Sequence, residues 1–381
     1  MTGAPLRVGI VANTIDAEYG VRTGGTLHFV EVAKRMTGWD VRVFVPSFVV
    51  GEISALLPKA SVVGMPSVHR ITKRRLTLYA ASLVSWIGRI RELRSCDVLY
   101  ASSHFLGDTI PAVLVRGRRT LVVVHHIIDR PADRSGGRFG NAVAYVTERL
   151  SLALVRAGGG SLAFDNSVVA AECRKLGVRN RSVVSGNGID VPPAAGNGRV
   201  AHDVAYVGRL SPMKAVDDLL RAWQLVVRDV RGAHLRIIGE GTASFRNSLV
   251  ALRGELGLDG SVTFLGRAAD DEKFAVLRAS SVFAFASKEE GWGIAVAEAM
   301  ACGLPAVTYD LPAYREIFTA GRVSVPVGDV AAFAREVVAL LRDAERRDAL
   351  GREAQLLATG FTWDKVARAE IELIRDLAGC S

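Results

Sequence analysis

The stretch EEGWGIAVAEAMACGLP, residues 289–305, sets two carboxylates, Glu290 and Glu298, eight positions apart around a turn that contains two glycines. It follows the short apolar run SVFAFAS (281–287) and opens an apolar helical pattern. A plain amphipathic helix needs neither the glycines nor an acid ahead of its first turn. We therefore expect a strand, a glycine turn and a helix N-terminus, with the acids at the carboxyl end of the strand, where parallel sheets bind ligands.

The rest of the chain repeats this order of elements. Short apolar or β-branched runs alternate with helix-length segments in both halves: LRVGIVA, DVRVFV, DVLYAS, TLVVVHH and GSLAFD, then HDVAYVG, AHLRIIG, SVTFLG, SVFAFAS and PAVTY. Strands that alternate with helices predict parallel sheets covered on both faces. The predicted fold class is α/β, with two Rossmann-like, doubly wound parallel-sheet domains that face a cleft.

The domain boundary is predicted from composition. The stretch VPPAAGNGRV (191–200) is rich in Pro, Gly and Ala and lies between the two series of strands. Such a stretch is typical of a linker. It separates an N-terminal domain of residues 1–190 from a second domain of residues 201–361.

Length and composition limit the class of protein. The chain has 381 residues, 49% of them hydrophobic and 23% charged, which is enough to bury two ordinary cores. No run approaches the roughly 20 apolar residues of a membrane-spanning helix, and the N-terminus lacks the layout of a signal peptide. The four cysteines (Cys96, Cys173, Cys302 and Cys380) show no metal-binding spacing. We expect a cytoplasmic protein with idle thiols.

The net charge of +9 is unevenly distributed. Residues 1–190 hold 25 Lys and Arg against 14 Asp and Glu, a net +11, so the remainder carries −2. A basic surface attracts nucleic acid, anionic lipid or a phosphorylated substrate. Nucleic acid is disfavoured as a partner, because no aromatic platform or recognised module lies among the arginines.

Three glycine-containing loops follow predicted strands. In GRLSPMK, Arg209 and Lys214 precede a helix, an arrangement that suits a diphosphate, although a solvated basic loop is the alternative. In IIGEG, Gly239 and Gly241 allow the backbone to approach a ligand, and a tight turn is the alternative. A third loop ends in GG (24–25) and lacks the GxGxxG fingerprint, which argues against a nicotinamide enzyme.

The two acids of the opening stretch suit a ligand rich in hydroxyl groups. Glu290 lies before the helix and Glu298 about one and a half turns into it. Carboxylates at these two heights accept hydrogen bonds from the hydroxyls of a polyol. The alternative is that Glu290 is an acid favoured by the helix dipole and that Glu298 is merely solvated.

These motifs together resemble the GT-B retaining glycosyltransferases of family 4. EGWGIAVAEAMACGLPAV is similar to their Glu-x7-Glu signature, which is followed by EAMA-x-G-x-P-V. Further matches are VGRLSPMK, the GG that opens a helix, GWDVRVFVP, GNGID, VTFLGR and the closing FTWDKVARAEIELI. They keep the family's order from residue 6 to about residue 374. The resemblance also implies that a C-terminal helix (362–381) crosses back to the N-terminal domain.

The resemblance implies roles for individual residues. Glu290 would contact the hydroxyls of the transferred sugar, and Glu298 would accept from the nucleotide ribose. Arg209 and Lys214 would clamp the diphosphate in place of a metal ion. Gly25 would let backbone N–H groups meet the distal phosphate.

Further donor-binding residues are implied around the same loops. They are Gly24, Gly208, Gly239, Gly241, Gly266, Arg267, Gly291, Trp292, Gly293, Ile294 and Ala295, with the backbone at 266–267 flanking the base. The family's catalytic histidine matches VVVHH, where spacing favours His126 and His125 is the runner-up. A structural role for either histidine as a loop residue is the alternative.

The activity implied by the resemblance is retaining transfer of a sugar from a UDP- or GDP-sugar to a hydroxyl of a glycan or lipid-linked acceptor. It needs no cofactor and no metal, and the departing phosphate takes the proton of the acceptor. Two alternatives are an inactive GT-B subunit that only binds sugar nucleotide and a GT-B sugar-nucleotide epimerase. The segment 71–94, basic at both ends and apolar around Trp86, suits either an anionic membrane at its inner face or a core-packed helix.

Overall fold

The structure is a computed structural model that describes residues 5–15, 21, 23–67, 75–128, 137–191, 200 and 202–379. These residues divide into two compact units. The first unit takes the chain as far as Gly188 and again from Trp363, and the second takes Ile189–Thr362. Of the predicted linker, residues 192–199 lie outside the described part of the chain.

The first unit is built on a parallel sheet. Seven strands pair in the described part of this unit, in the order β3-β2-β1-β4-β5-β6-β7. The chain works outward from β1 in one direction and then returns to β4 to work outward in the other, which is the doubly wound pattern. The strands are β1 (Arg7–Val11), β2 (Asp40–Pro46), β3 (Ser61–Met65), β4 (Val98–Ala101), β5 (Thr120–Val124), β6 (Ser161–Phe164) and β7 (Ser182–Val184).

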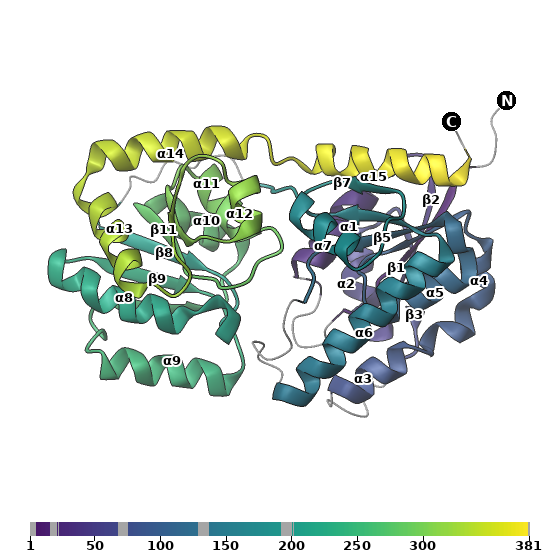
Figure 1. Cartoon of the computed structure of the whole chain (residues 1–381), viewed down its shortest axis with the longest axis horizontal. Coiled ribbons are helices and arrows are strands. Elements are labelled where there is room, and N and C mark those ends of the chain that lie inside the picture. Colours follow the sequence, from purple (N-terminus) through teal and green to yellow (C-terminus); the bar gives the residue numbers. More distant parts are fainter. Residues whose placement is uncertain are drawn as a thin grey trace. The chain divides into compact units, whose positions relative to one another are not determined.

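Helices cover both faces of this sheet (Figure 1). Along β5, Leu121 and Val123 belong to one buried cluster and Val122 and Val124 to another, because successive strand side chains point to opposite faces. One cluster holds α1 (Gly24–Lys34), α2 (Val50–Leu56) and α15 (Trp363–Ala378). The other holds α4 (Ile90–Ser95), α5 (Leu106–Arg116), α6 (Gly137–Gly158) and α7 (Ser167–Lys175).

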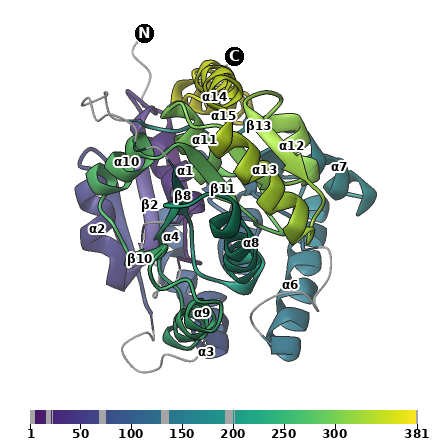
Figure 2. The ribbon, with the colours of Figure 1, turned by 90° about the vertical axis from the view of Figure 1, so that its left-hand side faces the viewer.

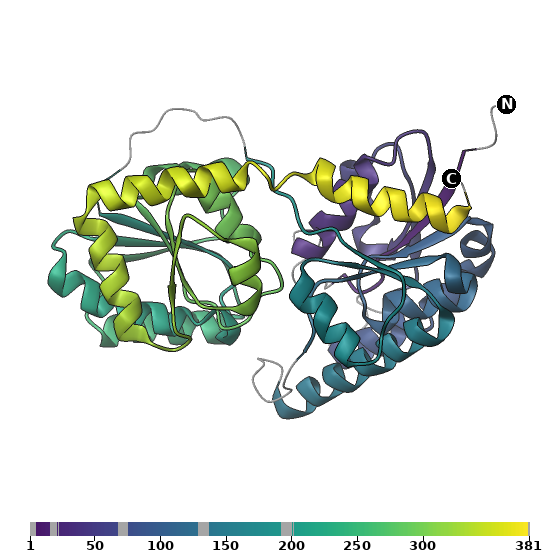
Figure 3. The ribbon, with the colours of Figure 1, turned by 45° about the horizontal axis from the view of Figure 1, so that its top comes forward.

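The last helix, α15, belongs to the first unit. Its buried residues include Trp363, Val366 and Ile374, which recur at helical spacing and pack into the same cluster as α1. Arg35 at the end of α1 forms an ion pair of 2.5 Å with Asp364. In Figure 3, α15 (yellow) crosses one face of the first unit's sheet. The two ends of the chain therefore build one core.

The second unit repeats the architecture with a smaller sheet. Six strands of its described residues pair in parallel, in the order β10-β9-β8-β11-β12-β13. They are β8 (Asp203–Val207), β9 (His234–Ile238), β10 (Val262–Gly266), β11 (Val282–Phe285), β12 (Ala306–Tyr309) and β13 (Arg322–Val325). The prediction of two doubly wound parallel sheets is confirmed.

Helices also flank the second sheet, and α8 and α13 lie alongside each other (Figure 2). The helices are α8 (Val216–Asp229), α9 (Ala243–Glu255), α10 (Asp270–Ala279), α11 (Ile294–Ala301), α12 (Pro312–Ile317), α13 (Val330–Arg342) and α14 (Ala344–Ala358). Tyr206, Trp223 and Phe333 are fully buried in the single core of this unit. The sequence pattern thus produces two units, each with buried side chains packed against its own parallel sheet.

The segment 71–94 is broken into short pieces where it is described. Helix α3 (Arg75–Ser82) is followed by a 3-10 turn (Ser85–Arg89), whose Trp86 packs into the core with its indole N–H donating to the Leu83 carbonyl at 2.7 Å. The basic residues Arg70, Lys73 and Arg74 lie outside the described residues. Within the described part of the chain, none of the helices combines the length and the apolar character needed to cross a membrane.

Candidate functional site

In the second unit, the loops that follow β8, β9 and β10 lie side by side at the carboxyl edge of the sheet. The Gly239 amide donates to the Gly266 carbonyl at 2.8 Å, and Leu210 bridges to Gly241. A Cβ on Gly239 would lie 1.8 Å from the Gly208 carbonyl oxygen, and one on Gly241 would lie 2.0 Å from that of Leu210. The predicted glycines are therefore required by the loops themselves, whatever ligand they bind.

Lys214 and Glu290 are brought together although 76 positions separate them. The Lys214 ammonium donates to the Glu290 carboxylate, and the two side chains are only 14% and 12% exposed. Their loops are joined by the Lys288 amide, which donates to the Met213 carbonyl at 2.8 Å. A pair largely shielded from water interacts more strongly than a surface pair. The first predicted acid is thus fixed by the predicted diphosphate cation.

The glycine turn before α11 has a conformation that favours glycine. Gly293 has φ of 101° and caps α11, and a Cβ there would lie 2.8 Å from the Tyr314 ring. Trp292 is 5% exposed and packs edge-on against Phe318 and Phe361. Its side chain therefore anchors the turn in the core.

The first turn of α11 presents backbone amides close to this anchored loop. Ile294 and Ala295 are half-buried, as are Glu290 and Gly291 just before them. Free amides at a helix N-terminus carry partial positive charge that favours an anionic ligand. The predicted amide donors thus share a loop and a helix start with the first acid.

Glu298 lies on α11 and is 9% exposed. The Lys273 ammonium donates to its carboxylate at 2.8 Å and lies 3.1 Å from a carboxylate oxygen of Asp270. Burial raises the pKa of Glu298 and the Lys273 charge opposes that rise. Burial lowers the pKa of Lys273, but the Glu298 and Asp270 carboxylates together outweigh it and the net shift is upward. Glu298 is therefore one partner of a buried ion pair and is not a solvated acid.

Two predicted cations, Arg209 and Arg267, have exposed side chains at the same edge. The Arg209 backbone is fixed by the buried Tyr206 hydroxyl, which donates to the Arg209 carbonyl at 3.2 Å.

The sequence did not point to Lys273 as a site residue, because α10 carries no motif and a single lysine on a helix gives no distinguishing signal.

In the first unit, the predicted Gly24–Gly25 pair opens α1. Thr23 caps the helix, with its hydroxyl accepting from the Thr26 amide at 3.3 Å. Gly24 is exposed and Gly25 is half-buried. A Cβ on Gly25 would lie 3.2 Å from the Nε2 atom of His125. The missing side chain at Gly25 thus makes room for an imidazole.

The two candidate histidines lie on opposite sides of the sheet edge. His125 faces α1 through Gly25, whereas His126 lies edge-on to the rings of His104 and Phe105 at 5.7 and 6.3 Å between centroids. The alternation along β5 continues past Val124 and sends the two side chains to opposite faces. The structure thus places the runner-up, His125, against the predicted phosphate-binding helix start.

Asp108 on α5 is a buried acid that the sequence analysis missed. It accepts from the Asn13 amide at 2.6 Å, the Thr14 hydroxyl at 2.9 Å and the Ser103 hydroxyl at 2.6 Å. Burial raises the pKa of its carboxyl to about 6, against the effect of these donors. Asp108 therefore holds the chain that leaves β1, in the loop between β1 and α1.

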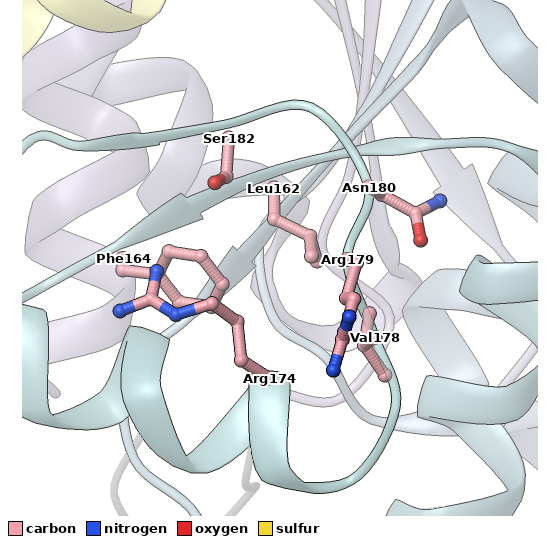
Figure 4. A pocket seen from close by; sticks show the side chains of 7 residues that line it. All are labelled: Leu162, Phe164, Arg174, Val178, Arg179, Asn180 and Ser182. Carbon is pink, nitrogen blue, oxygen red and sulfur yellow. The ribbon is translucent and has the colours of Figure 1, made fainter.

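A separate hollow of about 350 Å³ lies where β6 and β7 meet the end of α7 (Figure 4). Apolar side chains form part of its wall, and Arg174 and Arg179 stand at its sides in the close view. The lining residues are Leu162, Phe164, Arg174, Val178, Arg179, Asn180 and Ser182. It contains none of the predicted site residues, so we place the candidate site at the strand ends described above.

Part of the second unit matches a known protein family. Residues 201–357 match the family Glycosyl transferases group 1. The phosphatidyl-myo-inositol mannosyltransferase of Mycobacterium leprae is 35% identical over 194 residues, 48% of this chain and 50% of that protein. The D-inositol 3-phosphate glycosyltransferase of Nocardia farcinica is 32% identical over 176 residues, 44% of this chain and 39% of that protein. The chain thus spans about half or less of the length of these curated relatives.

Solved structures share the fold over nearly the whole chain. Sucrose-phosphate synthase from Thermosynechococcus elongatus superposes with a TM-score of 0.81 at 18% identity, covering 99% of this chain and 100% of that one. Anabaena HepE, solved with UDP and glucose, gives a TM-score of 0.76 at 18% identity, covering 97% and 100%. The two parallel-sheet units and these neighbours together show that the chain has the GT-B fold, and residues 201–357 of the second unit carry the match to the family Glycosyl transferases group 1.

Proposed function

We propose that this protein transfers a sugar from a nucleoside-diphosphate sugar to a hydroxyl of an acceptor, with retention of configuration and without a metal ion. The observation that carries the proposal is the pairing of both motif acids with lysines, Glu290 with Lys214 and Glu298 with Lys273, at the edge where the sheet binds ligands. Fixed acceptors for hydroxyls beside fixed cations for phosphates are what a sugar nucleotide requires.

The donor binds to the second unit in this proposal. Lys214 and Arg209 hold the diphosphate with the α11 amides, and Glu298 accepts from the ribose. Glu290 accepts hydrogen bonds from the sugar hydroxyls. Its partner Lys214 then donates to the Glu290 carboxylate and to the phosphate at the same time. Negative charge that develops on the departing diphosphate is stabilised by cations and amides that are already in position. Such electrostatic stabilisation is usually the largest contribution to catalysis.

Retention follows from the groups that are available. A double displacement needs a carboxylate nucleophile at the anomeric carbon. Glu290 is engaged by Lys214 and Glu298 is buried against Lys273, so neither is poised for attack. We therefore propose attack from the face of the leaving group, with a departing phosphate oxygen taking the proton of the acceptor hydroxyl.

His125 is the histidine that we propose for the first unit, in preference to His126. Its ring lies beside Gly25 at the start of α1, and its Nε2 atom, 3.1 Å from the Ser102 carbonyl, can exchange that acceptor for an oxygen of a bound substrate. Asp165 accepts from its Nδ1 atom at 3.0 Å and orients the ring. A structural role for His126 is consistent with its ring contacts to His104 and Phe105.

The acceptor that we propose carries phosphate, either free or in a lipid headgroup. The net +11 of residues 1–190 supports this proposal. Two relatives, a phosphatidyl-myo-inositol mannosyltransferase and a D-inositol 3-phosphate glycosyltransferase, also support it by their names. UDP and GDP are both candidate donors, and the UDP in the HepE structure supports the first.

Two measurements test the proposal. A panel of UDP- and GDP-sugars is screened for protection against thermal unfolding, since a ligand that binds the folded state raises its stability. Each protecting donor is then incubated with inositol, inositol phosphate or phosphatidylinositol vesicles, and the product linkage is read by NMR. Protection with no transfer to any acceptor would favour an inactive sugar-nucleotide-binding subunit, and inverted product would exclude the retaining route.

A further inference from the structure

Helix α15 brings a carboxylate into the core of the first unit that the proposed reaction does not use. Glu370 is fully buried and accepts three hydrogen bonds. They come from the Tyr100 hydroxyl at 2.9 Å, the Ser185 hydroxyl at 2.7 Å and the Nε2 atom of His28 at 2.8 Å. A buried carboxylate is costly unless such partners satisfy it. We call Glu370, Tyr100, Ser185, His28, Asn187 and Asp165 the Glu370 network.

The contacts of His28 determine its charge. Nε2 faces the Glu370 carboxylate and Nδ1 lies 3.0 Å from the side-chain oxygen of Asn187. Asn187 must present its oxygen there, because its amide nitrogen donates to Asp165 at 3.1 Å. A neutral imidazole has a single N–H, so only the imidazolium satisfies both acceptors. Burial lowers the pKa of His28, but the charge and hydrogen bond of Glu370, the Asp165 charge and the Asn187 hydrogen bond together outweigh it, and the pKa is raised to about 9.

The same network reaches the proposed site histidine. Asp165 accepts from the Asn187 amide and lies 3.0 and 3.1 Å from Nδ1 of His125. Nε2 of His125 lies 3.1 Å from the Ser102 carbonyl, so this ring also faces acceptors on both sides. The His28 and His125 rings meet edge-on, with 5.4 Å between centroids. A continuous series of hydrogen bonds therefore links α15 to the residue beside Gly25.

A metal ion is the competing explanation for this cluster. His28, His125 and Asp165 offer ligand atoms that lie within 4.8 Å of one another in the described chain. Metal binding requires neutral imidazole nitrogens. Both ring nitrogens of His28 already donate to acceptors, and an ion would have to displace one of those contacts together with the proton that His28 carries there. The hydrogen bonds satisfy every polar group of the cluster more simply.

We propose that Glu370 is a positioning residue for His125: its charge holds His28 as a donor to Asn187, which orients Asp165 and so fixes the orientation of the His125 ring. This inference rests on the proposed function, in which His125 meets the substrate. It assigns α15, the last helix of the chain, a part in the reaction without contact with either substrate.

The test labels the seven histidines of the full chain with ¹³C at Cε1 and assigns their NMR signals by single His→Gln variants. At pH 7.5, wild type should show His28 as an imidazolium. Glu370→Gln keeps the shape and removes the charge, so the His28 signal should move to the neutral position and the His125 signal should shift with it. Glu372→Gln, an exposed acid on the same helix, is the matched control and should leave both signals unchanged.

Kinetics give the second readout. Glu370→Gln should lower kcat about tenfold with the donor KM changed less than twofold, as expected when a positioning group is lost. Asn187→Ala breaks the link to Asp165 while the His28–Glu370 pair remains, and should shift His125 and lower kcat with His28 still charged. If Glu370→Gln does not fold, Asn187→Ala alone tests whether the network positions His125.

Two results would overturn the proposal. One is a neutral His28 in Glu370→Gln with an unchanged His125 signal and wild-type kcat. The other is a joint shift of the His28 and His125 signals on addition of one equivalent of Zn²⁺, which would assign the cluster to a metal. A wild-type protein that transfers no sugar would defeat the proposed function alone, because the NMR comparison needs no turnover.

Discussion

At the scale of single residues, the main finding is that the two motif acids are held by lysines. Lys214 contacts Glu290 and Lys273 contacts Glu298. Each carboxylate is thereby held in one direction in an environment largely shielded from water, where charged hydrogen bonds are strong. Substitution of an acid therefore removes a hydrogen-bond acceptor and also leaves an ammonium without its partner.

We expect Glu290→Gln to act mainly on kcat. The variant loses charged hydrogen bonds to the sugar, each worth about 1.5–3 kcal/mol, which corresponds to roughly a tenfold to a hundredfold lower rate. Steady-state kinetics with the natural donor measures this effect. Glu255→Gln, an exposed acid at the end of α9, is the control. Equal rates for Glu290→Gln and wild type would remove this acid from the reaction.

The Glu298–Lys273 pair should show strong coupling. Lys273→Met leaves a buried carboxylate without its counter-charge, and breaking such a pair costs about 3–5 kcal/mol. The double variant Lys273→Met/Glu298→Gln should recover part of this loss, because no unbalanced charge remains. Thermal unfolding of the two single variants and the double variant gives the coupling energy. Additive effects would mean that the pair is not an energetic unit.

At the scale of elements, the carboxyl edge of the second sheet depends on close packing of its loops. We expect Gly239→Ala to lower both thermal stability and donor affinity, the latter more than tenfold, because a Cβ there would lie 1.8 Å from the Gly208 carbonyl. Gly260→Ala has open space around the added carbon and serves as the control. Differential scanning fluorimetry with and without donor reports both quantities. Normal donor affinity in Gly239→Ala would separate this loop from the site.

Much of the architecture could be predicted from the sequence, because strand runs and helical periods are local patterns. The strand predicted at 281–287 appears as β11 (Val282–Phe285), followed by a glycine turn and α11. The face to which a residue points after a strand was harder to predict. His125 and His126 differ by one position, and counting from the strand favoured His126, whereas the pleat turns His125 toward α1.

The rest of the candidate site depends on contacts between distant segments. Lys273 on α10 contacts Glu298 on α11 only in the folded unit. The sequence of neither helix contains a signal that predicts this contact. Glu370 did leave a local signal, since an acid lies on the buried face of α15 between Ala367 and Ile371. The identity of its partners, 342 positions away in the case of His28, required the fold.

At the scale of the whole molecule, we expect activity to survive EDTA. Arg209, Lys214 and the α11 amides are the groups proposed to balance the diphosphate charge, and the sequence has no Asp-x-Asp stretch to hold a divalent ion. Transfer is measured after dialysis against EDTA, with Lys214→Ala as the comparison. Activity that disappears and returns with Mg²⁺ or Mn²⁺ would refute the metal-independent arrangement.

Stability should also fall as the pH rises above neutral. The pKa of His28 is raised from 6.5 to about 9 in the folded protein, so its contribution is complete below pH 6.5 and is lost as the pH approaches 9. The loss is at most about 3 kcal/mol for a shift of this size. Hydrogen exchange of α15 at pH 6.5 and 9 measures it, and Glu370→Gln should flatten the dependence. A pH-independent α15 in wild type would contradict the charged state of His28.

The position of α15 has a consequence for biosynthesis. A ribosome releases the chain from its N-terminus, so the first sheet emerges while the helix that covers part of one of its faces is still to be translated. The second unit, Ile189–Thr362, is continuous and is complete before Trp363–Ala378 appears. In the nascent first unit, the strands that α15 contacts (β4, β5 and β7) therefore remain partly uncovered until that helix is made. The unit that is translated first therefore completes its fold last, and we expect chaperones to bind to this unit during translation.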